Sequence, residues 1–427
     1  METIMKQIFT CADILLPTFR LDAEKMEKWS VIACDQYTSE AKYWNEVENY
    51  VGSSPSTLRL MLPEIYLESD PESRIAKIET AMKEYKSKVF ERFDHSMIYL
   101  KRTLKNGKIR RGIMGMLDLE AYDYNKGAEA YIRATEGTVL SRIPPRVKIR
   151  RGAALELPHI MMLIDDRENK IIEPLEASCA AFEKAYSFEL MQNGGRVDGF
   201  FIDKQTQSKL LALIDTLADP DSYEDKYGVR ENIPMIFAAG DGNHSLASAK
   251  AYYEELKKTL SPEAAACHPA RYALVELVNI HDNALDFEPI YRVVFDTDSS
   301  VLLDALKEYA VLDRGGQNSF EIECITESGT ESIRIENDNN ELAVGALQDF
   351  LDAYLASHDG KIDYIHGEGS AKALAKQKNA VGFIFDGMKK DELFKSVIKN
   401  GALPRKTFSM GEADDKRFYL EARSITE

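Results

Sequence analysis

Two periods of hydrophobic and polar residues alternate along the chain, and together they predict a mixture of helices and strands. Over residues 73–90, apolar side chains recur every three or four positions among charged ones, which predicts an amphipathic helix. Helices are also predicted over residues 39–50, 173–190, 206–217 and 243–256. Short apolar runs predict strands over residues 31–33, 96–103, 112–119, 157–164, 199–202, 235–239 and 273–279. This alternation predicts an α/β core with crossover helices.

The character of the chain changes after residue 295, where it becomes acidic and rich in helical patterns. Weaker strand patterns cover residues 320–326, 332–336 and 382–385. The 427 residues suffice for two or three domains of about 150 residues each. We therefore place a junction near residue 296, and expect an α/β protein of mixed α+β character in three parts. These parts are an N-terminal α+β region over residues 1–130, a core over residues 131–295 and a C-terminal α+β region over residues 296–427.

The overall charge is strongly negative, because 54 Lys and Arg face 71 Asp and Glu and leave a formal net charge of −17. A nucleic-acid backbone requires a dominant cationic face, so the main ligand is not expected to be nucleic acid. The five cysteines form no Cys-x-x-Cys pair, and the N-terminus has no signal-peptide pattern. No apolar run approaches the ~18 residues of a membrane span. We expect a cytoplasmic protein with a small-molecule substrate and no membrane partner, and leave homo-oligomer formation open.

The sharpest local signal is a Gly-Asp-Gly turn that joins a predicted strand directly to a predicted helix. Amides at a helix N-terminus attract anions, and Gly242 allows a phosphate to approach the backbone closely. Asn243, His244 and Ser245 offer further donors to phosphate oxygens, and Asp241 offers a ligand for Mg²⁺. A tight turn in which Asp or Asn caps the helix is an alternative of about equal weight.

A basic run stands out in this acidic chain. Arg142, Arg146, Lys148, Arg150 and Arg151 fall within ten residues that contain no acid. In an extended segment, Arg146, Lys148 and Arg150 would share one face, and three cations on one face suit a polyphosphate. The alternative is a solvated edge strand that charge protects from aggregation.

Three isolated residues are further candidates for chemistry. Glu136 is the only acid between Glu129 and Glu156, and a carboxylate beside a cation cluster can accept a proton from an alcohol. An ordinary salt-bridge partner is the alternative, and from sequence alone it is the favoured role of this residue. Arg292 and Lys406 each follow a proline closely, and each segment could simply begin a strand.

These motifs resemble, over most of the chain, a bacterial family of domains of unknown function, number one thousand and fifteen. The family signature, Asp-Gly-His-His-Arg at a strand-to-helix junction, is matched by Asp241, Gly242 and His244, whereas Asn243 and Ser245 depart from it. Asp35 represents the family's Pro-Tyr-Asp segment, and the remaining motifs appear in the family's order, at Glu136 and Thr138, at Pro289, Arg292 and Val293, and at Pro404, Lys406 and Thr407.

The resemblance implies a ParB/sulfiredoxin-like core with additional N- and C-terminal α+β regions, related to free-serine kinases. The signature turn has no cysteine, which argues against sulfiredoxin chemistry, and the net charge argues against partition-type DNA binding. Of the activities found in related proteins, the resemblance therefore implies phosphoryl transfer from ATP, ADP or pyrophosphate to a small hydroxylated metabolite. Free L-serine is the leading candidate for the acceptor.

In that reaction the implied catalytic residues are Glu136, Asp241 and His244. Glu136 would accept the hydroxyl proton, and Asp35 or Asp241 would position Mg²⁺. The donor phosphates would be held by Gly242, Asn243, Ser245, Arg142, Arg146, Arg150, Arg292 and Lys406. Two other functions remain open: a non-catalytic nucleotide- or phosphate-binding regulatory module of the ParB-like fold, and a nuclease or DNA-binding relative.

Overall fold

The computed structural model describes residues 7–67, 69–312, 316, 318–337 and 342–426. The chain divides into two compact units. Unit 1 comprises Met1–Leu285 together with Glu412–Glu427, and unit 2 comprises Asp286–Gly411. The sequence pattern did not predict that the end of the chain returns to the first unit. The ParB-like core within residues 131–295 stays a prediction.

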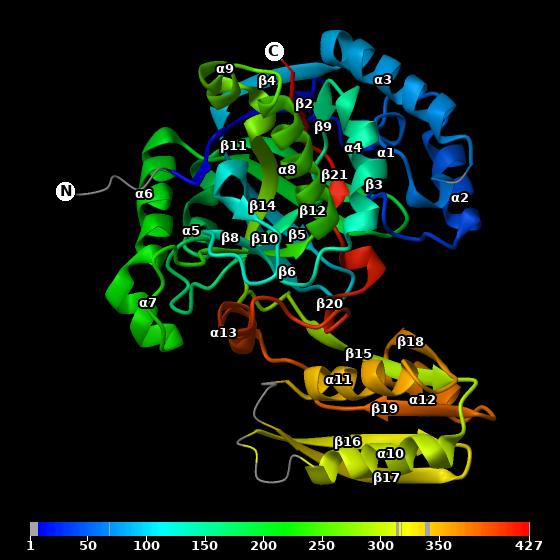
Figure 1. The fold of residues 1–427 in the computed structure, drawn as a ribbon. Helices are drawn as coiled ribbons and strands as arrows, with labels where there is room; N and C mark the ends of the chain where they lie inside the picture. The colour runs from blue at the N-terminus through cyan, green and yellow to red at the C-terminus, as the bar shows by residue number, and fades with distance from the viewer. Residues whose placement is uncertain (1–6, 68, 313–315, 317, 338–341, 427) are drawn as a thin grey trace. The chain divides into compact units, whose positions relative to one another are not determined.

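Unit 1 is built on a mixed sheet of ten strands among the described residues (Figure 1). In order across the sheet these are β11 (Glu183–Leu190), β12 (Gly195–Phe201), β5 (Ile98–Thr103), β6 (Ile109–Asp118), β14 (Tyr272–Asn279), β10 (Met161–Ile164), β13 (Phe237–Asp241), β8 (Ile132–Ala134) and β7 (Tyr122–Asp123), with β1 (Phe9–Thr10) also paired to β6. The pairs β10–β14, β13–β8 and β7–β8 are parallel, and the other pairs are antiparallel. The expected mixed α/β class is confirmed.

Successive residues of the central strands enter two different apolar cores, one on each face of the sheet. Ile98 and Leu100 belong to one core, whereas the intervening Tyr99 belongs to the other. The flanking helices are α1 (Ala23–Trp29), α2 (Ala41–Val51), α3 (Pro71–Lys88), α4 (Ile143–Arg151), α5 (Leu175–Ser178), α6 (Lys204–Asp215), α7 (Pro220–Tyr227), α8 (Asn243–Lys257) and α9 (Pro262–Cys267). Helices α4 and α8 pack side by side (Figure 1).

Three two-stranded pairs complete unit 1, and two of them involve the end of the chain. They are β2 (Ala12–Pro17) with β4 (Phe90–Ser96), β3 (Val31–Ile32) with β21 (Phe418–Tyr419), and β9 (Leu155–Glu156) with β22 (Arg423–Ser424). The chain end is therefore fixed by backbone hydrogen bonds to strands from early and middle parts of the sequence.

Two predicted elements of unit 1 are wrong. The helix expected over residues 173–190 is limited to short helical turns over residues 175–181, and residues 183–190 form strand β11. In β11, buried Phe188 and Leu190 alternate with exposed Glu189, and the strand pairs with β12. The segment considered as extended from Arg146 to Arg150 lies in helix α4. Two prolines occupy the first turn of α4, where they suit a helix, and buried Ile143 and Val147, four residues apart, pack towards α8.

Unit 2 has a separate antiparallel sheet of six strands among its described residues. The path is β17 (Gly329–Asn337), β16 (Asn318–Thr326), β19 (Ala380–Ile384), β15 (Phe287–Phe295) and β18 (Lys361–His366), with β20 (Phe408–Met410) also paired to β15. Its helices are α10 (Ser299–Leu312), α11 (Ala343–Leu355), α12 (Glu368–Ala375) and α13 (Lys390–Asn400). Helix α12 packs on β15 and β19. Across the described parts of both units, no helix has the length and apolar character that crossing a bilayer requires.

Candidate functional site

The predicted strand-to-helix turn is present, between β13 and α8. Gly242 connects them with a φ of 75°, a left-handed conformation that favours glycine. A Cβ atom at this position would lie 3.0 Å from the Cα of Ile160, so a side chain here would be crowded as well as strained. Asp241 Oδ1 accepts a hydrogen bond from the Gly242 amide at 2.9 Å, which fixes the carboxylate beside the helix N-terminus.

A segment that follows β8 lies against this turn. The hydroxyl of Thr135 donates to the Ala239 carbonyl at 2.8 Å, and the side-chain amide of Asn243 donates to the Thr135 hydroxyl at 3.5 Å. The Val139 amide donates to Nε2 of His244 at 3.3 Å. Glu136, expected from the sequence to act as a base, follows Thr135 directly in this segment.

His159, which the sequence reasoning did not select, connects three parts of the chain at the same place. Its Nδ1 lies 2.8 Å from the hydroxyl of Tyr419, and its Nε2 lies 3.2 Å from the hydroxyl of Ser245 on α8. The Asp35 carboxylate is 3.6 Å from the same Nε2. The imidazole is buried.

Two carboxylates and one ammonium group complete the cluster. Lys416 Nζ lies 3.4 Å from the Asp241 carboxylate, and its side chain is only 13% exposed. Burial disfavours the charged form of Asp35, but His159, Gln36 and Lys416 outweigh it and hold the pKa of this carboxyl below its usual range. Asp35 is therefore an anion at neutral pH, as metal binding or charge pairing requires.

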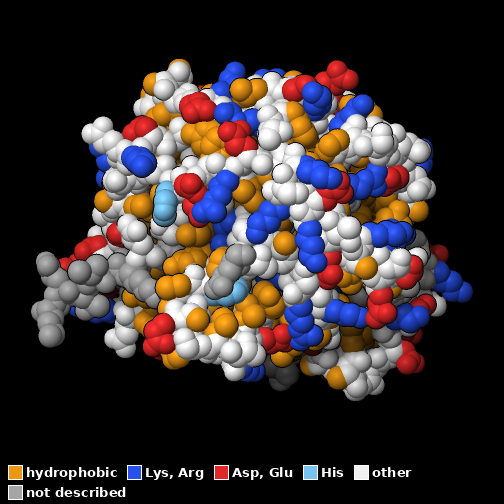
Figure 2. All heavy atoms as spheres, turned by 90° about the horizontal axis from the view of Figure 1, so that it is seen from above, with side chains coloured by type: hydrophobic (Ala, Val, Ile, Leu, Met, Phe, Trp, Pro, Cys, Tyr) orange, Lys and Arg blue, Asp and Glu red, His pale blue; other side chains and the backbone are white. Residues whose placement is uncertain are grey.

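The basic run lies on α4, and most of its cations already bind carboxylates of unit 1. Arg146 pairs with Glu64, Lys148 with Glu72, Arg150 with Glu156, and Arg151 with Glu255. The three cations expected on one strand face do not share a face, because the segment is helical. In the face shown in Figure 2, Lys and Arg side chains are interspersed with Asp and Glu.

Two members of this run nevertheless lie close to the α8 turn. Glu64, the partner of Arg146, donates its backbone amide to the Cys34 carbonyl, next to Asp35. Arg142 is exposed, three residues after Val139, and its side chain has no ion-pair partner among the residues that the structure describes. Arg142 is therefore the member of the run whose charge is available to a ligand.

The last two predicted donor-binding residues belong to unit 2. Arg292 is fully buried, and its guanidinium donates to Gln348 Oε1 at 3.1 Å and to the carbonyls of Arg405 and Lys406 at 2.9 and 2.8 Å. These bonds hold the 405–406 backbone, where Lys406 is exposed with a φ of 55°. The Arg292 guanidinium is thus engaged within unit 2, so we base the proposed site on unit 1.

Comparison with known proteins identifies the family. The family model described as "Protein of unknown function (DUF1015)" matches residues 15–396. The chain belongs to this family. A search among curated proteins found no match.

The DUF1015 chain also resembles several solved structures at low similarity. A free serine kinase variant in complex with AMP is 11% identical, with a TM-score of 0.38, covering 75% of this chain and 94% of that chain. SbnI from Staphylococcus aureus, truncated at its C-terminus, is 10% identical with a TM-score of 0.35, covering 72% and 82%. A conserved hypothetical protein from Pyrococcus furiosus is 12% identical with a TM-score of 0.34, covering 73% and 94%. Similarity at this level carries no argument about activity.

The two departures from the DUF1015 signature are both integrated into the site. Asn243 bonds to Thr135, and Ser245 lies within hydrogen-bond distance of His159. Two buried oxygens at this turn, Asn243 Oδ1 and Thr138 Oγ1, have no hydrogen-bond partner among the described residues. Buried polar atoms usually have partners, so these two mark the turn as a place where a polar ligand or water can bind.

The residues present are compatible with Mg²⁺, although they do not form a complete metal site by themselves. Asp35 and Asp241 do not gather with a third His, Cys, Asp or Glu ligand atom within 4.8 Å, as far as the described residues show. Mg²⁺ is commonly bound by one or two carboxylates together with substrate phosphates and water. Asp35 and Asp241 would fit that role only with a phosphorylated ligand.

Sequence spacing gave no signal for His159, Lys416 or Tyr419. Lys416 and Tyr419 lie more than 150 residues after the α8 turn, in a segment whose return to unit 1 was not predicted. His159 follows Pro158 in an apolar run without metal-like spacing. To find Lys416 and Tyr419, one would have had to predict that residues 418–419 pair with β3.

Proposed function

We propose that this protein is a phosphotransferase that binds the phosphate groups of its donor at the N-terminus of α8 and transfers a phosphoryl group to a small hydroxylated metabolite. The observation that supports this most is that Asp35, His159 and Lys416, from three distant parts of the chain, meet the Asp241–Ser245 turn. Phosphoryl transfer requires mainly positioning and stabilisation of negative charge, which such a cluster supplies.

The donor phosphates would bind where several positive groups converge. The amides of a helix N-terminus carry partial positive charge, and α8 has 15 residues, so its dipole is well developed. Lys416 is next to Asp241 and supplies a positive charge, whereas His244 Nε2 accepts a hydrogen bond from the Val139 amide and so has no proton to offer at that atom. Arg142 is exposed and has no carboxylate partner among the described residues, so its charge would be available to a bound phosphate.

The acceptor alcohol would be activated by Glu136, which the chain places beside Thr135 at the turn. A carboxylate accepts a proton from the attacking hydroxyl as the bond to phosphorus forms. Mg²⁺ held by Asp35 and Asp241 would neutralise charge on the donor phosphates. Free L-serine is the leading acceptor on the strength of the sequence resemblance.

The test is an assay of the purified full chain with L-serine, Mg²⁺ and ATP, ADP or pyrophosphate, read by ³¹P NMR. We expect phosphoserine with at least one donor, and Glu136→Gln should lower turnover at least about 100-fold, the scale of general-base catalysis, with little change in donor affinity. Glu129→Gln is the matched control, because Glu129 is an exposed carboxylate seven residues earlier. If no donor yields phosphoserine and no other alcohol is phosphorylated, the proposal is wrong.

A second function follows from the two departures at the signature. Asn243 and Ser245 replace a His and an Arg of the family pattern, so this turn carries fewer cations. A non-catalytic module that binds a nucleotide or phosphate would keep the turn and Lys416 but need no base. Thermal stabilisation by ADP or pyrophosphate that Glu136→Gln leaves unchanged, without product under any condition, would favour this function.

A further inference from the structure

The α8 turn holds a hydroxyl, an imidazole and a carboxylate in the arrangement of an activated nucleophile. Ser245 Oγ lies 3.2 Å from Nε2 of His159, and the Asp35 carboxylate lies 3.6 Å from the same nitrogen. On the other side of the ring, Nδ1 lies 2.8 Å from the hydroxyl of Tyr419. A nucleophile within hydrogen-bond reach of a base, which a third group orients, is the geometry that covalent catalysis uses.

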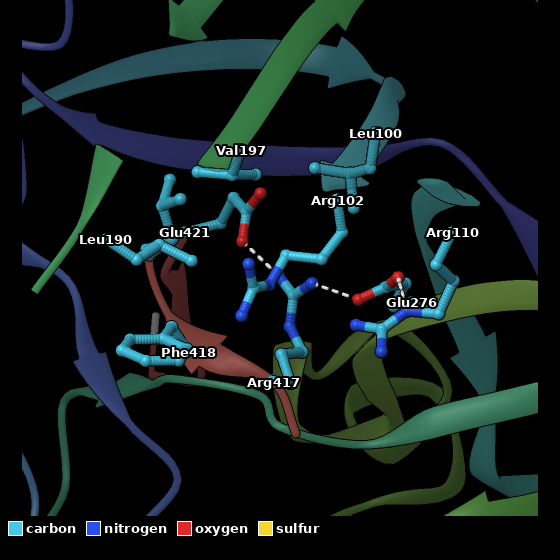
Figure 3. Close-up of a pocket in the computed structure, with 10 residues that line it drawn as sticks. Leu100, Arg102, Arg110, Leu190, Val197, Glu276, Arg417, Phe418 and Glu421 are labelled. Carbon is cyan, nitrogen blue, oxygen red and sulfur yellow. Dashed lines mark hydrogen bonds and ion pairs between the residues drawn. The ribbon is translucent and has the colours of Figure 1, made fainter. Parts of the chain in front are cut away.

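Buried contacts fix the segment that carries His159. Arg417 Nε donates to the carbonyl of Pro158, the residue directly before this histidine, at 3.1 Å. The same guanidinium lies between the carboxylates of Glu276 and Glu421 and binds both (Figure 3). Arg417 is also followed directly by strand β21, which supplies the hydroxyl at Nδ1. The imidazole is thus held in place by protein groups alone, as a general base requires.

The surroundings of the ring also favour transfer of the Ser245 proton to it. The Tyr419 oxygen accepts a hydrogen bond from the Cys34 amide at 3.3 Å and has a second lone pair for Nδ1–H of His159. In that tautomer, Nε2 carries its lone pair towards Ser245. The Asp35 carboxylate, which is an anion at neutral pH, stabilises the imidazolium that forms when Nε2 takes the proton.

Ser245 also lies where the donor phosphates are proposed to bind. It is partly buried and belongs to the first turn of α8, which begins at Asn243. The base is close to the same turn, because a Cβ atom on Gly242 would lie 3.4 Å from Cδ2 of His159. A phosphate on the amides of this helix N-terminus is therefore next to the hydroxyl of the same turn.

We propose that Ser245 is a nucleophile that takes the phosphoryl group from the donor and passes it to the acceptor alcohol, through a covalent phosphoserine on the protein. This inference rests on the proposed phosphotransferase function and specifies its chemistry. In the first step, the Ser245 oxygen bonds to the terminal phosphorus of a nucleoside polyphosphate or pyrophosphate, and the bond from that phosphorus to the bridging oxygen breaks. The bridging oxygen keeps the electron pair and leaves with the rest of the donor, while the Ser245 proton moves to His159 Nε2.

The second step consumes the phosphoserine. The acceptor oxygen bonds to phosphorus, and the bond from phosphorus to the Ser245 oxygen breaks with its electron pair on the serine. His159 returns its proton to that oxygen, and Glu136 takes the proton of the acceptor hydroxyl. No co-reactant besides donor and acceptor is needed. Because the first product leaves before the acceptor reacts, the kinetics should be ping-pong.

The first test uses the unaltered full chain and no acceptor. The protein is incubated with Mg²⁺ and phosphorus-labelled ATP, ADP or pyrophosphate, quenched in acid and mapped by mass spectrometry of its peptides. We expect a phosphoryl group on Ser245, and exchange of label between each donor and its own leaving group. If no donor gives either labelling of Ser245 or exchange, the proposal is wrong.

Addition of L-serine and other small alcohols to the same reactions separates this inference from the proposed function. Phosphorylated product without labelling or exchange would leave the phosphotransferase function intact and overturn the intermediate. Labelled Ser245 without transfer to any alcohol would support the nucleophile and reject the proposed acceptor class.

The second test distinguishes a nucleophile from a hydroxyl with a merely structural role. Ser245→Ala should abolish labelling and exchange but still bind pyrophosphate. Ser248→Ala is the matched control and should keep both, because Ser248 lies about one turn further along α8 and its hydroxyl donates to the His244 carbonyl at 2.6 Å. His159→Gln should slow formation of the phosphoserine about 100-fold, the scale of general-base catalysis. Labelling or exchange that survives Ser245→Ala would overturn the proposal.

Discussion

Helix α4 and the N-terminal turn of α8 lie in the same unit, but they differ in whether their polar and charged groups already have partners. On α4, the cations Arg146, Lys148, Arg150 and Arg151 each bind a carboxylate. At the α8 turn, the sequence shows few cations, but Asn243 Oδ1 and Thr138 Oγ1 are buried without a described partner, and Lys416 arrives from the chain end. The region with the most cations in the sequence is thus not the region whose polar groups are free to bind a ligand.

The difference has an energetic reason. Removing one partner of a buried ion pair destabilises the protein strongly, so the largely buried pairs Arg146–Glu64 and Arg150–Glu156 hold α4 to the rest of unit 1. The pairs of Lys148 and Arg151 are exposed and contribute little to stability. Buried polar groups without partners lower the stability of the protein instead, and they are found mainly at sites where a ligand or catalysis requires them. The following four predictions test whether the α4 charges are structural and the α8 groups functional.

The largest effect is expected at the buried end of α4. Glu156 accepts hydrogen bonds from Arg423 at 2.7 Å and from the Leu274 amide at 2.9 Å, and it also binds Arg150. Glu156→Gln leaves buried Arg423 and partly buried Arg150 without a carboxylate partner among the described residues, and should lower the free energy of unfolding by about 3 kcal/mol. Urea unfolding monitored by circular dichroism measures this. Glu72→Gln, which breaks the exposed pair with Lys148, should cause no measurable change.

If Glu156→Gln proved as harmless as Glu72→Gln, the α4 cations would not be held structurally, and the contrast with the α8 turn would disappear. Phosphate binding by α4 would then have to be reconsidered.

Next in size is the effect of Lys416 on ligand affinity. Lys416→Met removes a nearly buried ammonium group beside Asp241. We expect the dissociation constant for pyrophosphate, measured by isothermal titration calorimetry, to rise about tenfold or more, since a charge-assisted hydrogen bond contributes roughly 1.5–3 kcal/mol. Lys148→Met on α4 serves as the control and should leave the affinity unchanged. Equal losses in both variants would mean that the ligand does not discriminate between the two regions.

A smaller effect is expected from the hydroxyl of Ser245. Ser245→Ala removes one hydrogen-bond partner of His159 and should lower the free energy of unfolding by about 1 kcal/mol. His159 keeps its contact with Tyr419, so the fold should survive. Chemical unfolding gives the stability, and a variant as stable as the wild type would show that the Ser245–His159 contact is incidental.

The last prediction concerns acid. The folded pKa of Asp35 lies below its unfolded value, because His159, Gln36 and Lys416 overcome the effect of burial. Its contribution to stability is therefore present above the unfolded pKa and is lost as the pH falls through the folded pKa. Between pH 6 and pH 3 the wild type should lose more stability than Asp35→Asn. Parallel curves for the two proteins would contradict this assignment.

Local patterns predicted much of the fold. The amphipathic period over residues 73–90 corresponds to α3, and the apolar runs over residues 96–103 and 112–119 overlap the paired strands β5 and β6. The strand-to-helix turn at Gly242 was found because its conformation demands glycine and the flanking apolar pattern changes there. These features depend on neighbouring residues, which a single sequence displays.

The features that failed depend on distant partners. Residues 183–190 form a strand because β12 offers backbone hydrogen bonds, and the basic run is a helix because α8 buries Ile143 and Val147. In the candidate site, Asp35 and Asp241 were expected, whereas Lys416 and His159 were not. Nothing near Lys416 in the sequence indicates a ligand; its position comes entirely from where the chain end is fixed.

The late return of the chain has a consequence for how the protein is made. Lys416 and Tyr419 are synthesised only after all of Asp286–Gly411 has been translated. A nascent chain that has already formed the central strands still lacks both the ammonium group beside Asp241 and the hydroxyl beside His159. The cluster can thus be assembled only after unit 2 has been translated, and a product that terminates before residue 416 lacks it.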